Sequence, residues 1–472
     1  MTAFYLMIIL FVVGYLCIAL EHPLKINKTA FALVLGVLIW LVYIVTGPGI
    51  FDITNFGGNW NAFLEEHPGA HFSDFITKHE LLEHLGDIAE ILFYLMGAMT
   101  VVELIDSHGG FNIITDRITT KSKVKLLWLL SFITFFFSAL LDNLTTAIVM
   151  VALLRKLLPE KKDRWFFGGM VILAANAGGA WSPIGDVTTI MLWIGGNIST
   201  GVVISQCIVP SLISMIIPLI IVSFMEKGTI ADMPKSENEE KKAHIPSWRR
   251  NLIFWLGIAA LVFVPVFKTL THLKPYMGIM LGLGVLWIVT EIISRNDHEK
   301  HKKLAITSVL TRIDLPSILF FLGILLAVAG LQSAGHLSML AGGMDTAFNG
   351  NYYLIDIIIG ALSSIVDNVP LVAGVMGMYD LTVFPQDSML WVFLTYCAGT
   401  GGSLLIIGSA AGVAVMGMEK IDFIWYLKHI TPYAIIGYLA GAGAYILMDK
   451  FIFSAGEVAG ATAALMSAVP LG

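Results

Sequence analysis

Apolar runs as long as a bilayer crossing recur through almost the whole of this chain and leave little room for a soluble fold. Of the 472 residues, 57% are hydrophobic and only 13% are charged, whereas charged residues make up about a quarter of a soluble domain. The first run, from Phe4 to Leu20, has no basic segment before it and no small-residue cleavage motif after it, so we interpret it as a retained span and not as a signal peptide. The sequence therefore predicts an all-α polytopic membrane protein.

Positive charges beside the apolar runs predict which ends of the spans face the cytoplasm. Lys25 and Lys28 follow the first run, and further basic clusters lie at 155–164 and 295–312. The polar segment 47–90, by contrast, is rich in aspartate and glutamate and holds one lysine. We therefore expect ten crossings, a cytoplasmic side at the basic loops and both termini on the outer, periplasmic side.

The apolar run from Leu126 to Leu154 starts and ends at basic loops, so both of its ends are predicted to face the cytoplasm. Asp142 and Asn143 lie at its middle. Each arm has about 14 residues, or about 20 Å of helix, which is too short for the ~30 Å hydrocarbon layer. The run therefore predicts a re-entrant helical hairpin with Asp142-Asn143 at its tip. A carboxylate at this depth is expensive, which favours a role in handling an ion.

Glycine and proline interrupt the next apolar run, which extends from Trp165 to Ile194. The interruption reads Asn176-Ala-Gly-Gly-Ala-Trp-Ser-Pro-Ile-Gly-Asp186. Because glycine and proline are poor helix residues, this run predicts two half-helices joined by an unwound segment.

The second half of the chain repeats these features at a nearly constant spacing. The Asp-Asn pair recurs at Asp367-Asn368, 225 positions later, and the paired glycines of the break recur at Gly401-Gly402, 223 positions later. The flanks of the second hairpin, 336–351 and 379–388, contain no lysine or arginine, so this hairpin is predicted to enter from the outer side. Hairpins that enter from opposite sides predict inverted repeats, each with a re-entrant hairpin and a broken transmembrane helix.

The repeats divide the chain into five predicted segments. We expect N-terminal spans and an outer acidic loop over 1–90, a first transport repeat over 91–225, a cytoplasmic linker with two connecting spans over 226–315, a second transport repeat over 316–450 and a C-terminal tail over 451–472. The two tips and the two breaks should meet near the middle of the bilayer, where free backbone carbonyls can coordinate a cation.

The side chains in the tips and breaks predict the sign of the ligand. Residues 126–154, 166–225 and 351–418 contain no lysine, arginine or histidine. A site of carboxylates and neutral oxygens suits a hard cation and repels an anion. Burial also favours the protonated form of a carboxyl group, so H+ and a cation can compete for it with no resident cofactor. The predicted cation- and proton-binding residues all carry polar oxygens and are Asp142, Asn143, Thr145, Thr146, Asn176, Ser182, Asp186, Thr188, Thr189, Ser364, Asp367, Asn368, Thr400, Ser403 and Ser409.

The two repeats differ in their oxygen ligands, because Asp186 aligns with Ser409 and Thr145 aligns with Pro370. We therefore place the primary Na+ site in the first repeat, with Asp367 and Asn368 across from it; its residues are Asp142, Asn143, Ser182, Asp186 and Thr189. Structural roles stay open for the same groups. Asp142 and Asp367 can be helix N-caps, Asp186 can brace nearby hydroxyls, and the glycines can serve close helix packing.

Four motifs carry a family resemblance. They are Asp142-Asn-Leu-Thr-Thr146, Ser182-Pro-Ile-Gly-Asp-Val-Thr-Thr189, Ser364-Ile-Val-Asp-Asn-Val-Pro370 and Gly399-Thr-Gly-Gly-Ser-Leu-Leu-Ile-Ile-Gly-Ser409. Together they resemble the NhaD-type sodium/proton antiporters of the ion transporter superfamily, over about residues 91–448. The resemblance implies a bacterial inner-membrane homodimer, with elevator-like motion, that exchanges Na+ or Li+ for H+. Anion carriers of the superfamily have a neutral Ser-Asn-Thr phrase at the hairpin tips, where this chain has Asp-Asn.

Three other functions fit parts of the sequence. A cation-coupled symporter of a small organic acid or oxyanion would need a positive or donor-rich pocket, which the tips lack. An intramembrane aspartyl protease would use Gly185-Asp186 and Tyr379-Asp380, but these stand in the reverse of that family's order, and no Pro-Ala-Leu phrase follows. A channel would also use buried oxygens, but inverted repeats with broken helices are typical of alternating access. Because the basic residues are confined to short loops, no nucleic-acid surface is expected, and the chain is predicted to be a transporter and not an enzyme.

Overall fold

Helices form the secondary structure throughout the part of the chain that the computed structural model describes, apart from one isolated bridge between Ser122 and Thr229. The described residues are 2–50, 58–111, 113, 118, 120, 122–225, 228–229, 245–295, 306–365 and 368–453. Within these ranges, eight helices are long and apolar enough to cross a membrane. The predicted all-α, multi-pass membrane protein is therefore confirmed.

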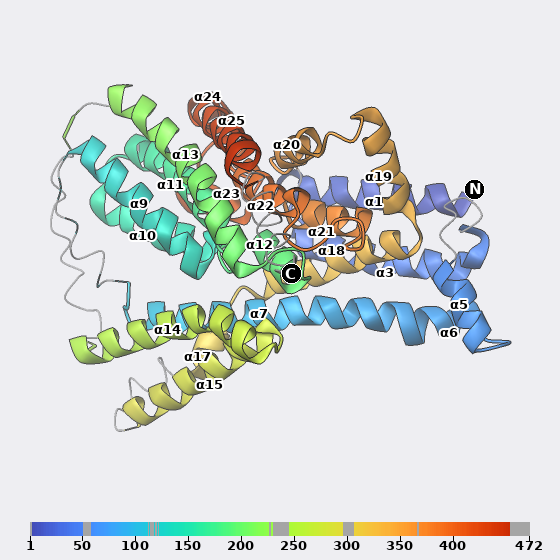
Figure 1. Ribbon diagram of the computed structural model, residues 1–472. Helices are drawn as coiled ribbons and strands as arrows, with labels where there is room; N and C mark the ends of the chain where they lie inside the picture. The colour runs from blue at the N-terminus through green and yellow to red at the C-terminus, as the bar shows by residue number, and fades with distance from the viewer. Residues whose placement is uncertain are drawn as a thin grey trace, which may run out of the picture.

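The helices are arranged in chain order as drawn in Figure 1. Their bounds are α1 (Thr2–Ala19), α2 (Glu21–Leu24), α3 (Lys28–Thr46), α5 (Gly58–Glu66), α6 (Phe72–Phe75), the π-helical η2 (Ile76–Glu80), α7 (Leu81–Ser107), α9 (Lys123–Leu141), α10 (Asn143–Leu157), α11 (Lys161–Gly179), α12 (Val187–Ile194), α13 (Thr200–Met225), α14 (Ser247–Thr271), α15 (Pro275–Ser294), α17 (Ile306–Leu310), α18 (Leu315–Ser333), α19 (His336–Ala347), α20 (Tyr352–Leu362), α21 (Asn368–Met378), α22 (Met389–Gly401), α23 (Ala410–Glu419), α24 (Phe423–His429) and α25 (Thr431–Met448).

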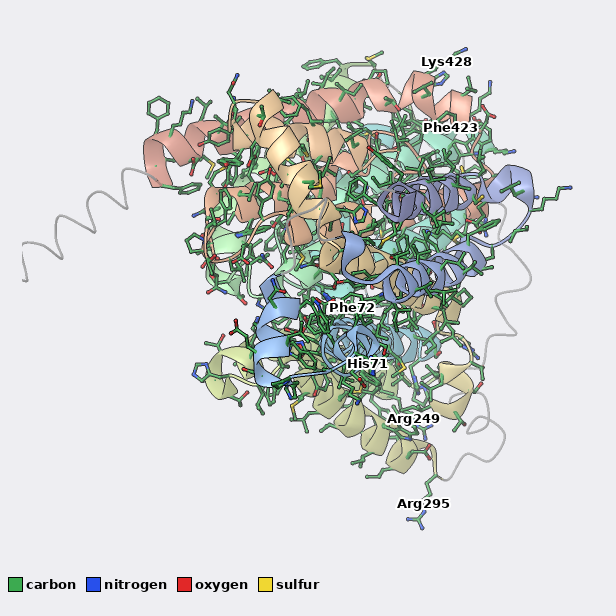
Figure 2. All side chains as sticks on the ribbon, turned by 90° about the vertical axis from the view of Figure 1, so that its right-hand side faces the viewer. His71, Phe72, Arg249, Arg295, Phe423 and Lys428 are labelled. Carbon is green, nitrogen blue, oxygen red and sulfur yellow. The ribbon has the colours of Figure 1, made fainter. Side chains whose placement is uncertain are left out.

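The third predicted span is the end of a longer helix. The hydropathy predicts its start at Ile91, but α6, η2 and α7 run together from Phe72 to Ser107 over 36 residues. Figure 2 faces the end of the molecule where His71 and Phe72 mark the start of this helix. Its acidic residues are compatible with helix because they find partners: the Asp74 carboxylate pairs with Lys78 at 2.7 Å, one turn away, and Glu80 accepts a hydrogen bond from a tyrosine of α3 at 3.1 Å. Residues 72–90 are therefore helix and not loop.

Two pairs of helices lie where the Asp-Asn pairs predict hairpins, and we call these pairs the first and the second hairpin. The first, α9 and α10, joins at Asp142, and α20 and α21 flank the second pair. In Figure 1 α9 and α10 lie at the left of the molecule, whereas α20 and α21 lie near its middle. The arms differ from the expected length, because α9 has 19 residues and α10 has 15, whereas α20 and α21 have 11 each. The extra length of α9 begins at Lys123, whose ammonium group pairs with Asp163 of α11 at 2.7 Å.

Both predicted helix breaks are present, between α11 and α12 and between α22 and α23. At Gly178 of α11 an added Cβ would collide with the carbonyl oxygen of Phe135 in α9. The same collision would occur between Gly401 of α22 and the carbonyl oxygen of Gly360 in α20. The first arm of each hairpin therefore lies in backbone contact with the broken helix of its own repeat. Entry of the hairpins from opposite sides of a membrane, and the five-segment division, stay predictions.

The second arms cross over between the repeats. α10 packs on α23 and α21 packs on α12, so each outgoing hairpin arm contacts the broken helix of the other repeat. The remaining long helices pack beside this assembly: α3 lies on α18, where Gly36 and Gly323 permit close backbone approach, and α7 lies on α14, α15 and α18. The crossing brings both tips and both breaks to one place inside the protein.

Candidate functional site

Several helices begin at the predicted site, and a predicted site residue caps each of three of them. Asp142 caps α10, Asp186 caps α12 and Ser409 caps α23, each by accepting a backbone N–H of the first turn at 2.7, 3.3 and 3.2 Å respectively. Such caps satisfy N–H groups that helix geometry leaves without partners. Two of the caps are carboxylates, which also complement the partial positive charge of a helix N-terminus. These two helix ends are therefore already matched by negative groups of the protein itself.

A hydrogen-bonded network joins the two hairpin tips and the two breaks. The Asp186 Oδ2 atom accepts from the Asn143 amide at 2.9 Å and from the Asn368 amide at 3.4 Å. Asn176 Oδ1 also accepts from the Asn143 amide, at 3.1 Å, and the Asn176 amide donates to Ser409 Oγ at 3.0 Å. We call these five residues the polar centre. All five were predicted as site residues, and the structure brings them together.

The polar centre is closed to solvent and carries one ionisable group. None of its five side chains is more than 3% exposed, and Asp186 is the only carboxylate among them. The segments that supply it, within 126–154, 166–225 and 351–418, contain no basic residue. A buried carboxylate in a low dielectric attracts a cation or a proton strongly. This arrangement can bind a small positive ion and is unfavourable for an anion.

Most of the predicted hydroxyl ligands donate to nearby backbone carbonyls instead of to the polar centre. The Ser182 hydroxyl donates to Ala139 in the tip of the first hairpin at 2.6 Å, and that of Thr189 donates to Gly179 at 3.5 Å. Ser364, Thr400 and Ser403 each donate to a carbonyl three or four residues earlier in their own segment. These hydrogen bonds fix the backbone of the tips and breaks. The hydroxyl groups therefore support the polar centre indirectly.

Asp142 uses both carboxylate oxygens on Thr145, accepting from its amide at 2.7 Å and from its hydroxyl at 2.9 Å. Its backbone has φ 83° and ψ 160°, a conformation nearly confined to glycine, and the two hydrogen bonds compensate for that strain. A small, mainly apolar cavity lies beside Asp142 and is lined by Tyr94, Leu95 and Leu261, among others. The N-cap interpretation of Asp142 is thus realised, and the structure does not hydrogen-bond it to the polar centre. Asp367 lies outside the described residues.

Two predicted hydroxyls are available as further ligands. The Thr146 and Thr188 hydroxyl oxygens are buried and have no hydrogen-bond partner in the part of the chain that the structure describes. Thr146 lies one turn after Asn143 on the same face of α10, and Thr188 follows Asp186 by two residues. A buried hydroxyl oxygen without a hydrogen-bond partner can serve as a ligand for an ion bound at the neighbouring carboxylate.

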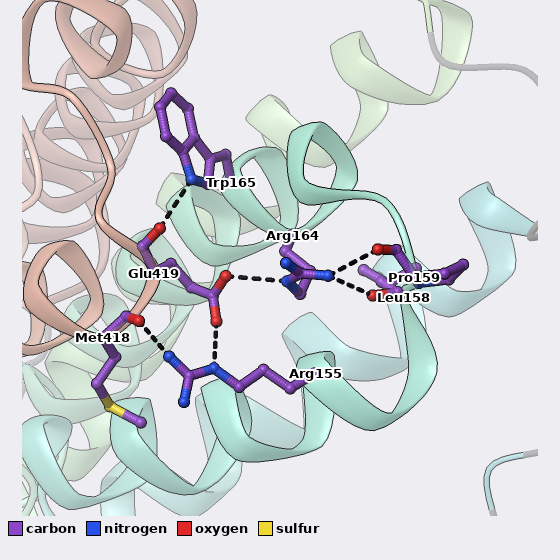
Figure 3. Close-up of polar contacts among 7 residues, drawn as sticks. All are labelled: Arg155, Leu158, Pro159, Arg164, Trp165, Met418 and Glu419. Atoms are coloured by element: carbon purple, nitrogen blue, oxygen red, sulfur yellow. Dashed lines mark hydrogen bonds and ion pairs between the residues drawn. The ribbon is translucent and has the colours of Figure 1, made fainter. Parts of the chain in front are cut away.

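The sequence did not identify two buried ionisable groups. Asp356 is a fully buried carboxyl on α20, and its signal was an acidic residue inside an apolar run without a basic neighbour. Glu419 follows an apolar run, and its side chain is buried between two arginines, with Arg155 at 2.5 Å and Arg164 at 3.0 Å (Figure 3). Such pairings depend on helices that are far apart in sequence.

The candidate protease dyad is not assembled. Asp186 is buried, whereas Asp380 is exposed at the end of α21 and accepts a hydrogen bond from the Thr382 amide at 2.7 Å. An aspartyl protease needs its two carboxyl groups side by side. The order of the two motifs and their placement both argue against this function.

Known proteins resemble the chain over almost its whole length. Residues 8–395 match the citrate transporter family. Sodium/proton antiporter 1 of Arabidopsis thaliana is 47% identical, over 95% of this chain and 73% of the relative, and sodium/proton antiporter 2 of the same plant is 45% identical, over 94% and 100%. The Na+/H+ antiporter NhaD of Alkalimonas amylolytica is 30% identical, over 94% and 91%. The chain therefore belongs to the citrate transporter family and, within it, to the NhaD-type sodium/proton antiporters, as its motifs predict.

Proposed function

We propose that this protein exchanges Na+ or Li+ for H+ by alternating access, and that Asp186 binds either the cation or the proton. The observation that carries the proposal is the position of Asp186, a buried carboxylate that accepts amide hydrogen bonds from both hairpin tips. A group shared by both tips senses any relative movement of the two repeats. Because protonation removes the charge that holds the cation, the two ions exclude each other at one site.

The amide of Asn143 marks where a cation would bind. Its nitrogen lies 2.9 Å from Asp186 Oδ2 and 3.1 Å from Asn176 Oδ1, so it occupies the space between two acceptor oxygens. Rotation of this amide by half a turn would present its oxygen instead of its N–H groups. The rotated amide, the two acceptor oxygens and the hydroxyls of Thr146 and Thr188 together supply the oxygen ligands that a hard cation takes.

The other residues predicted for the primary Na+ site have supporting roles in this proposal. Asp142 holds the tip of the first hairpin through its cap, and Ser182 and Thr189 hold the break through their bonds to backbone carbonyls. In the sequence, Asp367 is the residue of the second repeat that matches Asp142. We propose that it shapes the second tip as Asp142 shapes the first.

A second candidate is cation-coupled uptake of a small organic acid, which the description of the matched family favours. Such a substrate needs positive or donor-rich groups, whereas the segments of the polar centre have no basic residue. In sealed proteoliposomes, Na+-dependent accumulation of labelled citrate would favour this candidate over antiport.

We also propose that the protein is a homodimer of the bacterial inner membrane, in contact with the lipid bilayer, monovalent cations and protons. Relatives named Na+/H+ antiporter NhaD come from bacteria, and the basic loops give the cytoplasmic side that this location requires. Chemical crosslinking in native membranes, followed by fractionation of inner and outer membranes, tests both points.

The test of exchange uses acidified everted vesicles that contain the full chain. We expect NaCl and LiCl to collapse the pH gradient, and KCl and choline chloride to leave it intact. Asp186→Asn should abolish the response, because asparagine can still cap α12 but cannot carry a charge or a transferable proton. Asp380→Asn, which changes an exposed aspartate in the same way, is the matched control and should exchange normally.

Two results would contradict the proposal. If Na+ leaves the gradient intact in vesicles where the protein is folded and abundant, the protein is not an Na+/H+ antiporter. If Asp186→Asn exchanges as fast as the unaltered protein, Asp186 is not the shared group.

A further inference from the structure

Asp356 is a buried carboxyl group that the exchange proposed above does not use. It lies on α20, its side chain is 0% exposed, and neither of its carboxylate oxygens has a hydrogen-bond partner in the described part of the chain. An ionised carboxylate without water, a donor or a counter-ion is strongly disfavoured in such a place. The group must therefore be protonated or bound to a cation.

The groups near Asp356 carry no positive charge. Cys397 approaches it from α22, Tyr438 and Tyr445 from α25, and Tyr379 from the end of α21, all within electrostatic range of the carboxyl. Residues 351–418, which include α20, α21 and α22, contain no lysine, arginine or histidine. In the part of the chain that the structure describes, no basic residue pairs with Asp356 to neutralise its ionised form.

The three tyrosine hydroxyls already donate elsewhere. Tyr438 donates to a backbone carbonyl of α20 at 2.8 Å, Tyr445 to a glutamine of α13 at 3.4 Å and Tyr379 to Asp345 at 2.9 Å. A metal cation needs several oxygen ligands at once, whereas a proton needs one carboxyl oxygen. The surroundings of Asp356 therefore favour H+ over Na+.

The matching position in the first hairpin shows that packing does not require a carboxyl here. Ser131 lies 225 positions before Asp356, on the first arm of its hairpin, and is also buried. In the breaks the difference is reversed, because the first repeat has Asp186 where the second has Ser409. Each repeat thus holds one buried carboxyl that the other lacks, one in the polar centre and one outside it.

Polar groups lead from Asp356 to the end of α25. Tyr353 lies one turn before Asp356 on α20, and its hydroxyl donates to Asp449, which is partly exposed. Tyr445, on α25 and one turn before Asp449, lies within electrostatic range of these groups. Lys450 lies over the Tyr353 ring at 5.8 Å. This row of groups extends from the neighbourhood of Asp356 toward the end of the molecule where the second hairpin begins.

We propose that Asp356 is a second proton-binding site, separate from the polar centre, which takes up and releases H+ as the second hairpin moves against α22 and α25. The proposal rests on the proposed Na+/H+ exchange for its role in transport, but proton binding itself does not depend on that exchange. If both Asp186 and Asp356 give up a proton in each cycle, more protons than cations cross the membrane.

Proton binding is tested by infrared spectroscopy on the purified full chain in lipid. The unaltered protein should show a carbonyl band of a protonated carboxyl at neutral pH that shifts in heavy water, and Asp356→Asn should lack it. Asp380→Asn, at an exposed aspartate, should retain the band. A spectrum that Asp356→Asn leaves unchanged overturns the proposal.

The transport role is tested in proteoliposomes under a known pH gradient and membrane voltage. The measurement is the Na+ gradient at which net transport stops, which gives the number of protons exchanged per cation. We expect Asp356→Asn to transport one proton fewer per cation, with Asp380→Asn unchanged. An unchanged ratio in Asp356→Asn overturns the release of this proton during transport.

If Asp356→Asn does not fold, Asp356→Ser is tested in its place, because serine is the side chain at the matching position of the first hairpin. Failure of Na+/H+ exchange in the unaltered protein would leave the infrared result standing, so the two proposals fail separately.

Discussion

Asp142 and Asp186 have the same side chain and comparable positions in the sequence motifs, yet they have different surroundings. Both carboxylate oxygens of Asp142 bind Thr145 within the first turn of α10. Asp186 also caps a helix, but its second oxygen accepts amides from two hairpin tips. The contrast indicates a mainly structural role for Asp142 and a binding role for Asp186.

Substitutions at Asp142 should separate its cap from its charge. Asp142→Ala should lower the free energy of unfolding by about 1 kcal/mol, because the cap is lost. Asp142→Asn should keep the stability, since asparagine has almost the same shape and also caps helices. Thermal unfolding in detergent measures both effects. A loss of stability as large in Asp142→Asn as in Asp142→Ala would contradict the cap as the main contribution.

The sequence predicts which residues are polar at the site but not how they pair. All five residues of the polar centre were predicted from their place in the tips and breaks. Asn176 was left out of the primary Na+ set, because its link to Ser409 joins residues 233 positions apart and depends on how α11 crosses α23. Asp356 was missed because it lies one helical arm away from its tip. Local patterns identify tips and breaks, whereas partners depend on helix crossings.

At the scale of the helices, glycine positions predicted the helix breaks most reliably. The polar ends of helices were the least predictable feature. Gly178 and Gly401 mark the two breaks and also the closest backbone contacts of the hairpins. The start of the α6–α7 helix was missed by hydropathy because it depends on partners such as Tyr43, which holds Glu80. Apolar pattern therefore predicts where a helix is embedded, and side-chain pairing decides where it begins.

Gly178→Ala should destabilise the protein by about 1–3 kcal/mol, as overpacking does elsewhere. The added methyl group would push α11 away from the carbonyl oxygen of Phe135. Gly417 of α23 is the matched control, because a Cβ there would meet nothing within 4 Å. Thermal unfolding of Gly417→Ala should match the unaltered protein or exceed it slightly, since alanine favours helix. Equal stability of both variants would show that the hairpin does not depend on this contact.

At the scale of the whole molecule, one ion-pair cluster joins the first hairpin to the second repeat. Glu419, at the end of α23, accepts from Arg155 of α10 and from Arg164 of α11, and Trp165 donates to its backbone carbonyl at 3.0 Å (Figure 3). The Glu419 side chain is only 3% exposed, whereas that of Arg155 is 47% exposed. The more buried pair with Arg164 is therefore the stronger contributor, because solvent screens the other.

Glu419→Gln should lower the free energy of unfolding by about 3 kcal/mol, because it leaves a half-buried arginine without its counter-charge. Glu160→Gln, at an exposed glutamate close to the same cluster, is the control and should have little effect. Thermal unfolding at low and high salt measures the loss. If Glu419→Gln unfolds at the same temperature as Glu160→Gln, the cluster does not hold the repeats together.

The two repeats should be inverted across the membrane, and the exposed residues Asp380 and Lys420 can test it. Asp380 follows the second hairpin, and Lys420 follows α23 beside the basic cluster. In a chain with Cys17→Ser, which removes the partly exposed native thiol, Asp380→Cys should react with a membrane-impermeant maleimide from the outer side of intact cells. Lys420→Cys should react only in inverted vesicles. If both positions react from the same side, the hairpins do not enter from opposite faces, and alternating access between inverted repeats cannot be the mechanism.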